Sequence, residues 1–191
     1  MTEGEDEYRE WNPYRSKLAA TILNKARNTY VDKHSTILYL GASSGTTVSH
    51  VSDLTENTIY AVEFAPRSIR ELIQNCTTRD NVIPILADAN FPELYAKFIF
   101  EEINLIYVDI AQPNLTDIAI LNCKKYLKEG GILLLAIKAK SIDVTRPIQN
   151  IFQEQLQKLE KDGFEILEKI NISPYSRDHL MVIARFFRSS P

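Results

Sequence analysis

Short apolar runs alternate with longer amphipathic segments along most of the chain. Five runs are apolar over most of their length, as expected of strands covered on both faces, and occupy residues 36–41, 58–64, 81–88, 103–110 and 131–139. Helical spacing of apolar side chains predicts helices from Tyr14 to about Thr29 and near 46–54, 66–76, 91–99, 114–128 and 147–161. We expect the Gly130-Gly131 pair to stop the helix at 114–128. Repeated strand, helix, strand units predict a parallel sheet with right-handed crossovers, hence a doubly wound α/β domain.

The end of the chain departs from this rhythm. Two strand-like runs, 164–172 and 179–187, are joined by too few residues for a helical crossover, so they must pair antiparallel. A Rossmann-like sheet that is mostly parallel and closes with an antiparallel C-terminal hairpin is the arrangement of class I methyltransferases. The last strand of a dehydrogenase is parallel instead. The strongly acidic residues 1–10 predict a flexible, solvated arm before a single domain over 11–191.

Composition limits the classes of protein that the chain can represent. With 191 residues, 45% of them apolar and 25% charged, it can form one compact domain. No apolar run is long enough to cross a membrane and the N-terminus lacks a secretion signal, so we expect a soluble intracellular protein. Cys76 and Cys123 have neither disulfide nor metal-ligand spacing and predict two buried thiols and no metal site. The formal net charge of -3 excludes a global positive field, so binding of nucleic acid requires a local basic patch or a partner protein.

The loop after the first predicted strand is the first candidate for ligand binding. The strand ends at Gly41, a turn through Ala42 and Ser43 follows, and Gly45 leads into a helix beginning with Thr46 and Thr47. Backbone amides of such a turn face the sheet edge where open α/β sheets bind ligands. The loop has only two glycines and no lysine, so it matches neither the dinucleotide fingerprint nor a P-loop. By itself the loop is weak evidence for a ligand site and fits a tight turn better.

Three acidic residues converge on the same edge, because each ends a successive strand of the predicted parallel sheet. Glu63 lies at the end of the second strand, where a carboxylate can accept both ribose hydroxyls of an adenosine. Asp88 and Asp109 end the third and fourth strands. An adenosine with a cationic or zwitterionic tail suits this set, with Ala89 beside the adenine and Gln112 near the tail. A triphosphate would be repelled.

Two lysines and a histidine are candidates for catalysis. Lys138 ends the fifth strand and is therefore expected beside Asp109, whereas Lys17 lies on the N-terminal helix and His179 opens the last strand. A neighbouring cation lowers the pKa of a partly desolvated lysine and a neighbouring carboxylate raises it, which is how a basic amine is tuned. Each residue alone also has an ordinary interpretation, as a solvated lysine or as a hydrogen-bonded rim histidine.

Together, several motifs resemble one family in order and spacing. These motifs are WNPYRSKLAATI, YLGASSGTTVSHVSD, YAVEFAPRSIREL, IPILADAN, IYVDIAQPN, AIKAKSIDVT and RDHLMVIARF. They resemble the archaeal type of fibrillarin from about Trp11 to Arg185. The resemblance implies an RNA 2′-O-methyltransferase of box C/D guide ribonucleoproteins that uses S-adenosyl-L-methionine. The small β-rich N-terminal extension usual in that family is nearly absent, which bears on contacts of the extension and not on the chemistry.

The resemblance also implies site residues. Cofactor contacts are expected at the loop Gly41, Ala42, Ser43, Thr46 and Thr47 and at Glu63, Phe64, Asp88, Ala89, Asp109, Ile110, Ala111 and Gln112. The implied catalytic set is Lys17, Asp109, Lys138 and His179. In an in-line displacement, we expect Lys138 nearest the attacking 2′-hydroxyl, Asp109 orienting it, and Lys17 with His179 fixing the ribose and flanking phosphate.

The low net charge and the resemblance agree on how RNA reaches the site. A small basic ring is expected around it, made of Arg15, Lys17, Arg67, Lys138, Lys140, Arg146 and Arg177. Substrate selection is then left to a guide RNA that pairs with the target RNA, and to partners of the particle, namely a coiled-coil scaffold protein and a kink-turn-binding protein. By resemblance, the expected location is the archaeal cytoplasm.

Two other classes of function stay open from the residues. Another class I methyltransferase, acting on a protein or a small metabolite, would share the cofactor loop without needing both lysines and the histidine together. An inactive structural subunit that binds adenosine ligands would need no catalytic set. Transfer of a labelled methyl group to RNA separates these possibilities.

Overall fold

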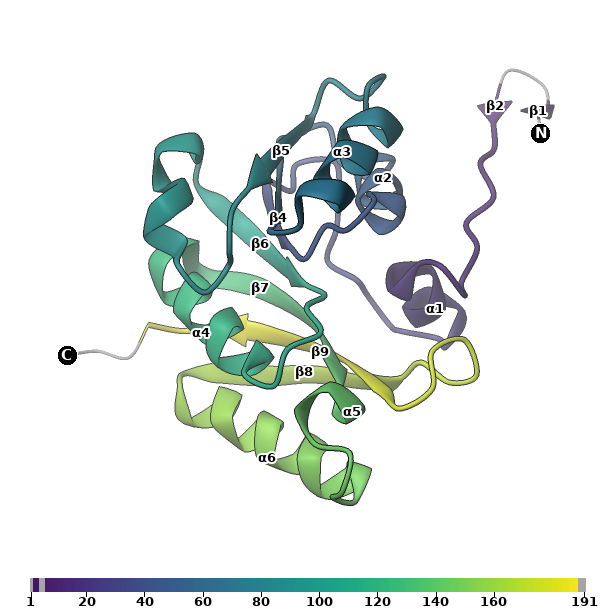
Figure 1. Ribbon diagram of the computed structural model, residues 1–191. Helices are drawn as coiled ribbons and strands as arrows, with labels where there is room; N and C mark the ends of the chain where they lie inside the picture. The colour runs from purple at the N-terminus through teal and green to yellow at the C-terminus, as the bar shows by residue number, and fades with distance from the viewer. Residues whose placement is uncertain (1, 4–5, 189–191) are drawn as a thin grey trace.

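The computed structural model describes residues 2–3 and 6–188 of the chain. A seven-stranded sheet runs through the molecule with helices on both sides (Figure 1). Its strands, in spatial order, are β5 (Val82–Leu86), β4 (Ile59–Glu63), β3 (Ile37–Leu40), β6 (Ile103–Val108), β7 (Leu127–Lys138), β9 (His179–Phe186) and β8 (Phe164–Asn171). The helices are α1 (Lys17–Leu23), α2 (Thr46–Ser52), α3 (Pro66–Asn75), the 3-10 helix η1 (Pro92–Phe98), α4 (Leu115–Tyr126), α5 (Ala139–Ile142) and α6 (Ile148–Lys161).

Strand directions place the ends of distant segments at one edge of the sheet. Strands β3 to β7 pair in parallel, whereas β9 lies between β7 and β8 and is antiparallel to both. The predicted fold class, a mostly parallel sheet closed by an antiparallel C-terminal hairpin, is confirmed. Because β9 runs in the opposite direction, its first residue, His179, lies at the edge where the parallel strands end, in register with Lys138.

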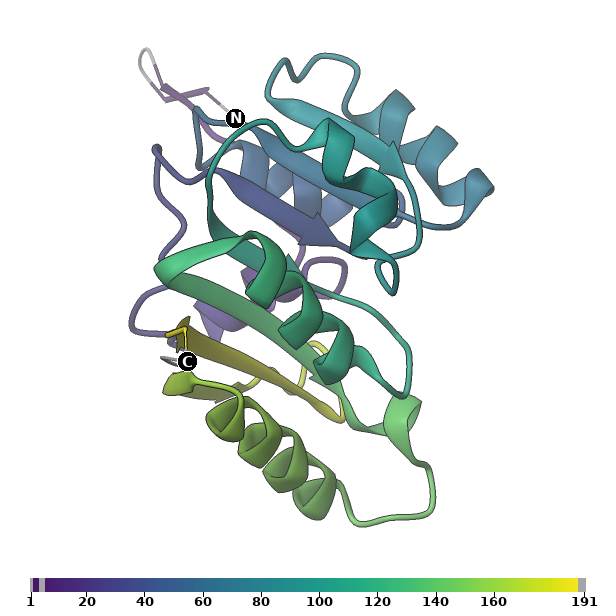
Figure 2. The ribbon, with the colours of Figure 1, turned by 90° about the vertical axis from the view of Figure 1, so that its left-hand side faces the viewer.

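The two faces of the sheet carry separate hydrophobic cores, since successive side chains of a strand point to opposite faces. Leu38 and Leu40 of β3 belong to the core that includes residues of η1, α4 and α6. Ile37 and Tyr39 belong to the core that includes α1, α2 and α3. Figure 2 shows α4 and α6 in front of the sheet. Within the part of the chain described, no helix is both long and apolar enough to cross a membrane.

Three predicted elements have different limits in the structure. The helix predicted from Tyr14 to about Thr29 ends at Leu23, because Asn24 caps it and Lys25 takes a left-handed φ of 64°. The helix predicted over 114–128 ends at Tyr126, and the Gly130-Gly131 pair lies inside β7 instead of stopping a helix. The segment near 91–99 forms a 3-10 helix. Apolar spacing located each segment, but local backbone geometry set its limits.

The last residues of the predicted acidic arm contact the domain at helix α2. Residues 2–3 and 6–7 form two short antiparallel strands, β1 (Thr2–Glu3) and β2 (Asp6–Glu7), while residues 1, 4–5 and 189–191 lie outside the described part. Arg9 donates to Ser49 Oγ at 2.8 Å and pairs with Asp53 at 2.8 Å. Trp11 stacks on His50 with ring centroids 4.7 Å apart. The junction between the arm and the domain, at Arg9 and Trp11, is therefore held against α2.

Candidate active site

The loop after β3 approaches the loop after β6 very closely. Gly41 has a φ of 83° and Gly45, before α2, has a φ of 88°. A Cβ atom built on Gly41 would lie 2.3 Å from the carbonyl oxygen of Asp109 and 3.1 Å from the Ile110 side chain. Only glycine permits both this backbone conformation and this approach. Gly41 therefore helps to fix the position of Asp109.

Glu63, the last residue of β4, organises the loops on either side of the cleft. Its side chain is buried, with 6% of the residue surface exposed. One carboxylate oxygen accepts a hydrogen bond from the Ser43 amide at 2.8 Å and the other accepts one from the Ala65 amide at 2.9 Å. Each oxygen keeps a second lone pair, so the predicted acceptance of ribose hydroxyls is chemically possible. Sequence reasoning missed the contribution of Glu63 to loop geometry.

These loops surround a cavity of about 430 Å³ at the carboxyl ends of β3 to β6. Ten of the predicted cofactor residues line it: Gly41, Ser43, Glu63, Phe64, Asp88, Ala89, Asp109, Ile110, Ala111 and Gln112. Ala42, Thr46 and Thr47 are not among the lining residues, and Ala42 and Thr47 are buried. Sequence reasoning missed four small lining residues, which carry no distinctive chemistry: Val62, Ala65, Ser68 and Ala87.

Asparagine side chains connect Asp88 with the loop after β6. Asp88 Oδ1 accepts hydrogen bonds from both the backbone amide and Nδ2 of Asn90, each at 2.9 Å. Asn90 Nδ2 also donates to Gln112 Oε1 at 3.1 Å, and Asn114 Nδ2 donates to Asn90 Oδ1 at 2.9 Å. Two walls of the cavity are thus held together by Asn90. Its sequence context, after LADA, gave no sign of this contact.

The cavity fits S-adenosyl-L-methionine better than it fits a phosphorylated nucleotide. Glu63, Asp88 and Asp109 all line it, and none of its described lining residues is a lysine or an arginine. These carboxylates favour a sulfonium and an ammonium group and disfavour phosphates, although one of them, Asp109, is paired with Lys17. Phe64, which is 63% exposed, offers an aromatic surface at this site.

Lys17 and Asp109 form an ion pair beside this cavity. Lys17 Nζ lies 2.8 Å from both carboxylate oxygens of Asp109. Lys17 is the first residue of α1, whose N-cap Ser16 accepts a hydrogen bond from the Ala19 amide at 3.3 Å. A cation in the first turn of a helix opposes the helix dipole, so this lysine is placed where helix stability alone would not favour it. The side chains are 25% and 20% exposed, which leaves the pair accessible to a substrate.

Lys138 and His179 lie at the same edge, on adjacent strands and in register. The charges of Lys17, Lys138 and Asp109 all act on the imidazole of His179, so the four predicted catalytic residues are brought together. Among the described residues, however, Asp109 forms its ion pair with Lys17 and none with Lys138. The prediction that Asp109 orients Lys138 therefore has no direct contact behind it in this structure and stays a prediction. Lys17 comes from a helix, so its proximity to Asp109 could not be derived from strand order.

His179 has a defined tautomer. Its Nδ1 lies 2.6 Å from the Arg177 carbonyl oxygen, which can only accept, so Nδ1 carries a proton and Nε2 of the neutral ring is an acceptor. Burial lowers the pKa of His179, and the positive charges of Lys17 and Lys138 lower it further against the opposing effects of the Arg177 carbonyl and Asp109. His179 is therefore mainly neutral at pH 7.

Two stacked tyrosines lie on the adjacent strands that lead into the site. Tyr39 of β3 and Tyr107 of β6 are in register, with ring centroids 4.5 Å apart, and both are buried. Burial raises the pKa of each hydroxyl well above its usual value, and the charge of Asp109 raises both further. Both tyrosines stay neutral and form a rigid support at the ends of β3 and β6, where Tyr39 lies two residues before Gly41 and Tyr107 two residues before Asp109. Sequence reasoning treated them only as strand residues.

The predicted basic ring is weaker than its seven members suggest. Four of them pair with carboxylates: Lys17 with Asp109, Arg67 with Glu71, Lys140 with Asp178, and Arg146 with Glu154. Arg15, Lys138 and Arg177 belong to no ion pair within residues 8–188. The positive potential available to RNA is therefore concentrated on these three side chains.

Residues 2–3 and 6–188 contain no group of three or more histidine, cysteine or acidic side chains that could hold a metal ion. Cys76 and Cys123 are free and buried, and burial raises the pKa of both thiols. Neither has the thiolate character of a metal ligand.

The sheet order, the cavity at its carboxyl edge and the acidic lining together define a class I methyltransferase. The fibrillarin family model matches residues 1–188. A fibrillarin-like rRNA/tRNA 2′-O-methyltransferase of Methanocaldococcus jannaschii is 50% identical over 181 residues, which covers 94% of this chain and 78% of that protein. The chain belongs to the fibrillarin family.

Two solved structures extend the comparison. Aeropyrum pernix fibrillarin in complex with natively bound S-adenosyl-L-methionine is 43% identical, with a TM-score of 0.86 over 95% of this chain and 80% of that one. The fibrillarin chain of a fibrillarin/Nop5p complex is 41% identical, with a TM-score of 0.88 over 95% of this chain and 86% of that one. The likeness extends through both the parallel strands and the C-terminal hairpin.

Proposed function

We propose that this chain transfers a methyl group from S-adenosyl-L-methionine to the 2′-hydroxyl of a ribose in rRNA or tRNA. The main support is the Lys17–Asp109 ion pair, 2.8 Å long, beside Lys138 and His179 and next to a cavity suited to an adenosine with a sulfonium tail. A methyltransferase for a small metabolite needs the cavity but not this set of residues. The names of the relatives agree with RNA as the substrate.

The bound cofactor supplies an electrophilic methyl group, and the residues of the chain align the acceptor and handle one proton. Glu63 would hold the ribose of the cofactor and Asp109 would attract its cationic end. The Lys17–Asp109 pair, fixed by α1 and by the approach of Gly41, would position the target ribose. Lys138 is the residue that we place nearest the hydroxyl. His179 presents a neutral ring with one acceptor nitrogen, so it can take a hydrogen bond from the ribose.

The substrate is delivered by a particle, since the chain has few unpaired cations near the site. We propose a box C/D guide ribonucleoprotein, in which a guide RNA pairs with the target. The partners would be a scaffold protein similar to the Nop5p of the solved complex and a kink-turn-binding protein. Delegating recognition to base pairing is compatible with a net charge of -3, because the enzyme then contributes little of the binding energy. We place the particle in the cytoplasm.

Labelled methyl transfer tests this proposal. The assay uses S-adenosyl-L-methionine with a tritiated methyl group and target RNA, with and without guide RNA and the two partner proteins. We expect label on the RNA only with the complete particle, and at least about a 100-fold lower rate for Lys17→Met. Label on a partner protein with none on RNA would contradict the proposal.

A further inference from the structure

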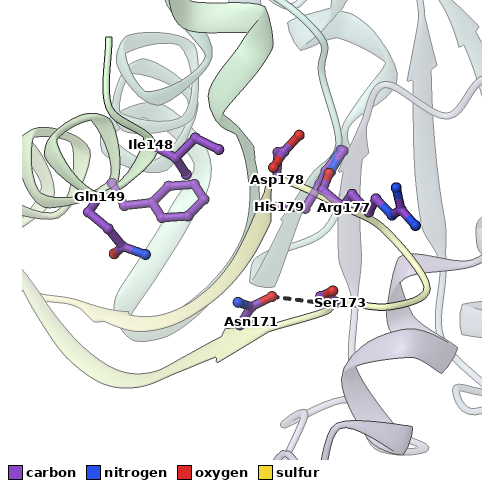
Figure 3. Close-up of a pocket in the computed structure, with 8 residues that line it drawn as sticks. Ile148, Gln149, Asn171, Ser173, Arg177, Asp178 and His179 are labelled. Carbon is purple, nitrogen blue, oxygen red and sulfur yellow. Dashed lines mark hydrogen bonds between the residues drawn. The ribbon is translucent and has the colours of Figure 1, made fainter.

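A second cavity lies on the far side of His179 from the cofactor cavity. Its volume is about 320 Å³, within the range of ligand sites, and it shares no lining residue with the cofactor cavity. Its walls come from the start of α6, the end of β8 and the turn before β9, as Figure 3 shows, and are formed by Ile148, Gln149, Phe152, Asn171, Ser173, Arg177, Asp178 and His179.

The walls of this second cavity carry both hydrogen-bond donors and acceptors, and their charged side chains are Arg177 and Asp178. The Ser173 backbone amide donates to Asn171 Oδ1 at 2.9 Å, the dashed line in Figure 3. Nδ2 of the Asn171 side chain is therefore left to donate elsewhere. Gln149 adds a second, exposed amide group. The carboxylate of Asp178 is neutralised by Lys140 Nζ at 2.7 Å, whereas Arg177 has no acidic partner in residues 8–188. The set favours an anion.

The position of the cavity relates it to the catalytic residues. His179 lines it and also interacts electrostatically with Lys17, Lys138 and Asp109. Two strand spacings of about 4.8 Å separate the tips of β7 and β8, which is about three times the roughly 3.4 Å rise per nucleotide of a duplex. The cavity is therefore within one to three nucleotides of a ribose placed at Lys138.

We propose that this second cavity binds the sugar–phosphate backbone of the target RNA next to the methylated ribose. The inference rests on the proposed function and adds the path of the substrate strand. The acidic cofactor cavity repels phosphates, so the strand must leave the catalytic residues on the other side, toward β9 and β8. Arginine and amide donors are typical phosphate ligands, and RNA duplexes are recognised mainly through phosphates and 2′-hydroxyls. Ile148 and Phe152 give the sugar an apolar surface.

Phosphate substitution in the complete particle tests this proposal. Uncharged methylphosphonates are placed one at a time at the three phosphates on each side of the target ribose. The proteins are wild type, the double variant Gln149→Ala/Arg177→Ala, and the control Gln153→Ala, an exposed glutamine one turn further along α6 that does not line the cavity. Methyl transfer is measured as kcat and KM, and cofactor binding by calorimetry.

We expect a single methylphosphonate to raise the wild-type KM for RNA about tenfold at one position or at two adjacent positions. The double variant should show a similar KM with unmodified RNA, no further response to those methylphosphonates, and normal cofactor binding. Arg177→Lys should recover part of the affinity, and Gln153→Ala should behave like wild type. Equal sensitivity of wild type and double variant at every phosphate would overturn the cavity assignment alone. Absence of methyl transfer by wild type on unmodified RNA would instead overturn the proposed function.

Discussion

Replacing Gly41 with alanine tests whether the close approach of two loops positions the catalytic residues. The new methyl group would lie 2.3 Å from the Asp109 carbonyl oxygen, and the residue would keep a φ of 83°. A left-handed conformation costs a non-glycine residue about 1–2 kcal/mol, and overpacking typically costs about 1–3 kcal/mol more. We therefore expect Gly41→Ala to lose about 2–5 kcal/mol of unfolding free energy. Relief of the clash would move Asp109, and with it the partner of Lys17.

Gly130 supplies a matched control for this substitution. Its φ is 70°, but a Cβ atom there would meet nothing within 4 Å. Gly130→Ala should therefore lose only the conformational part, about 1–2 kcal/mol, and keep full methyl transfer. Chemical denaturation of both variants measures the free energies, and the guided assay measures the activity. Equal destabilisation of the two variants, with activity intact in both, would refute the argument that backbone approach at Gly41 positions Asp109.

Three further substitutions test two residues of the site and one histidine of α2 outside it. Lys138→Ala should lower methyl transfer at least about 100-fold while calorimetry shows unchanged cofactor binding, and full transfer would contradict its placement at the hydroxyl. Glu63→Gln should weaken cofactor binding about tenfold or more. The side chain of glutamine has only one acceptor oxygen, so it cannot replace both carboxylate oxygens that accept hydrogen bonds from the Ser43 and Ala65 amides. An unchanged Kd would exclude Glu63 as a ligand. Burial and the positive charges of Arg9 and Arg79 lower the pKa of His50 from 6.5 to about 4. Between these two pH values the imidazole therefore binds a proton in the unfolded protein but not in the folded protein. The unfolding free energy should thus fall as the pH drops from about 6.5 to about 4, and less steeply in His50→Gln; parallel curves would contradict this.

Much of the edge architecture followed from strand order alone. Glu63, Asp88 and Asp109 were expected together because parallel strands end at one edge, and all three line the cofactor cavity. The same reasoning placed Lys138 at this edge, and the structure adds His179 to it, because β9 runs antiparallel to β7. Continuous apolar runs and helical patterns are sufficient for such conclusions, because burial of both faces of the sheet dictates the runs.

Contacts made by helices and loops could not be derived in that way. The pairing of Lys17 with Asp109 depends on where the segment before β3 places α1, and no periodicity encodes that position. Lys25 ends α1 through a left-handed φ, which apolar spacing does not report. Asn90 and the four small residues of the cofactor cavity act through shape and amide geometry. These features depend on tertiary packing, which overrides local preference.

The glycine pair shows how one signal can have two meanings. Gly130 and Gly131 were expected to end a helix, yet the helix ends earlier, at Tyr126, and the pair lies within β7. A Cβ atom on Gly131 would lie 2.6 Å from the Leu127 side chain, so the glycine is needed for close packing inside the strand. Glycine in a strand often marks such an approach.

Mass spectrometry of the target RNA tests the central claim most directly. The reconstituted particle is incubated with S-adenosyl-L-methionine and either the normal target or one carrying a single 2′-deoxy nucleotide at the guided position. The RNA is then digested with a nuclease, and the masses of the fragments are measured. The account predicts one added methyl group at the guided ribose of the normal target and none on the deoxy target. A methyl group on the deoxy target, or on a base of either RNA, would contradict ribose methylation by this chain.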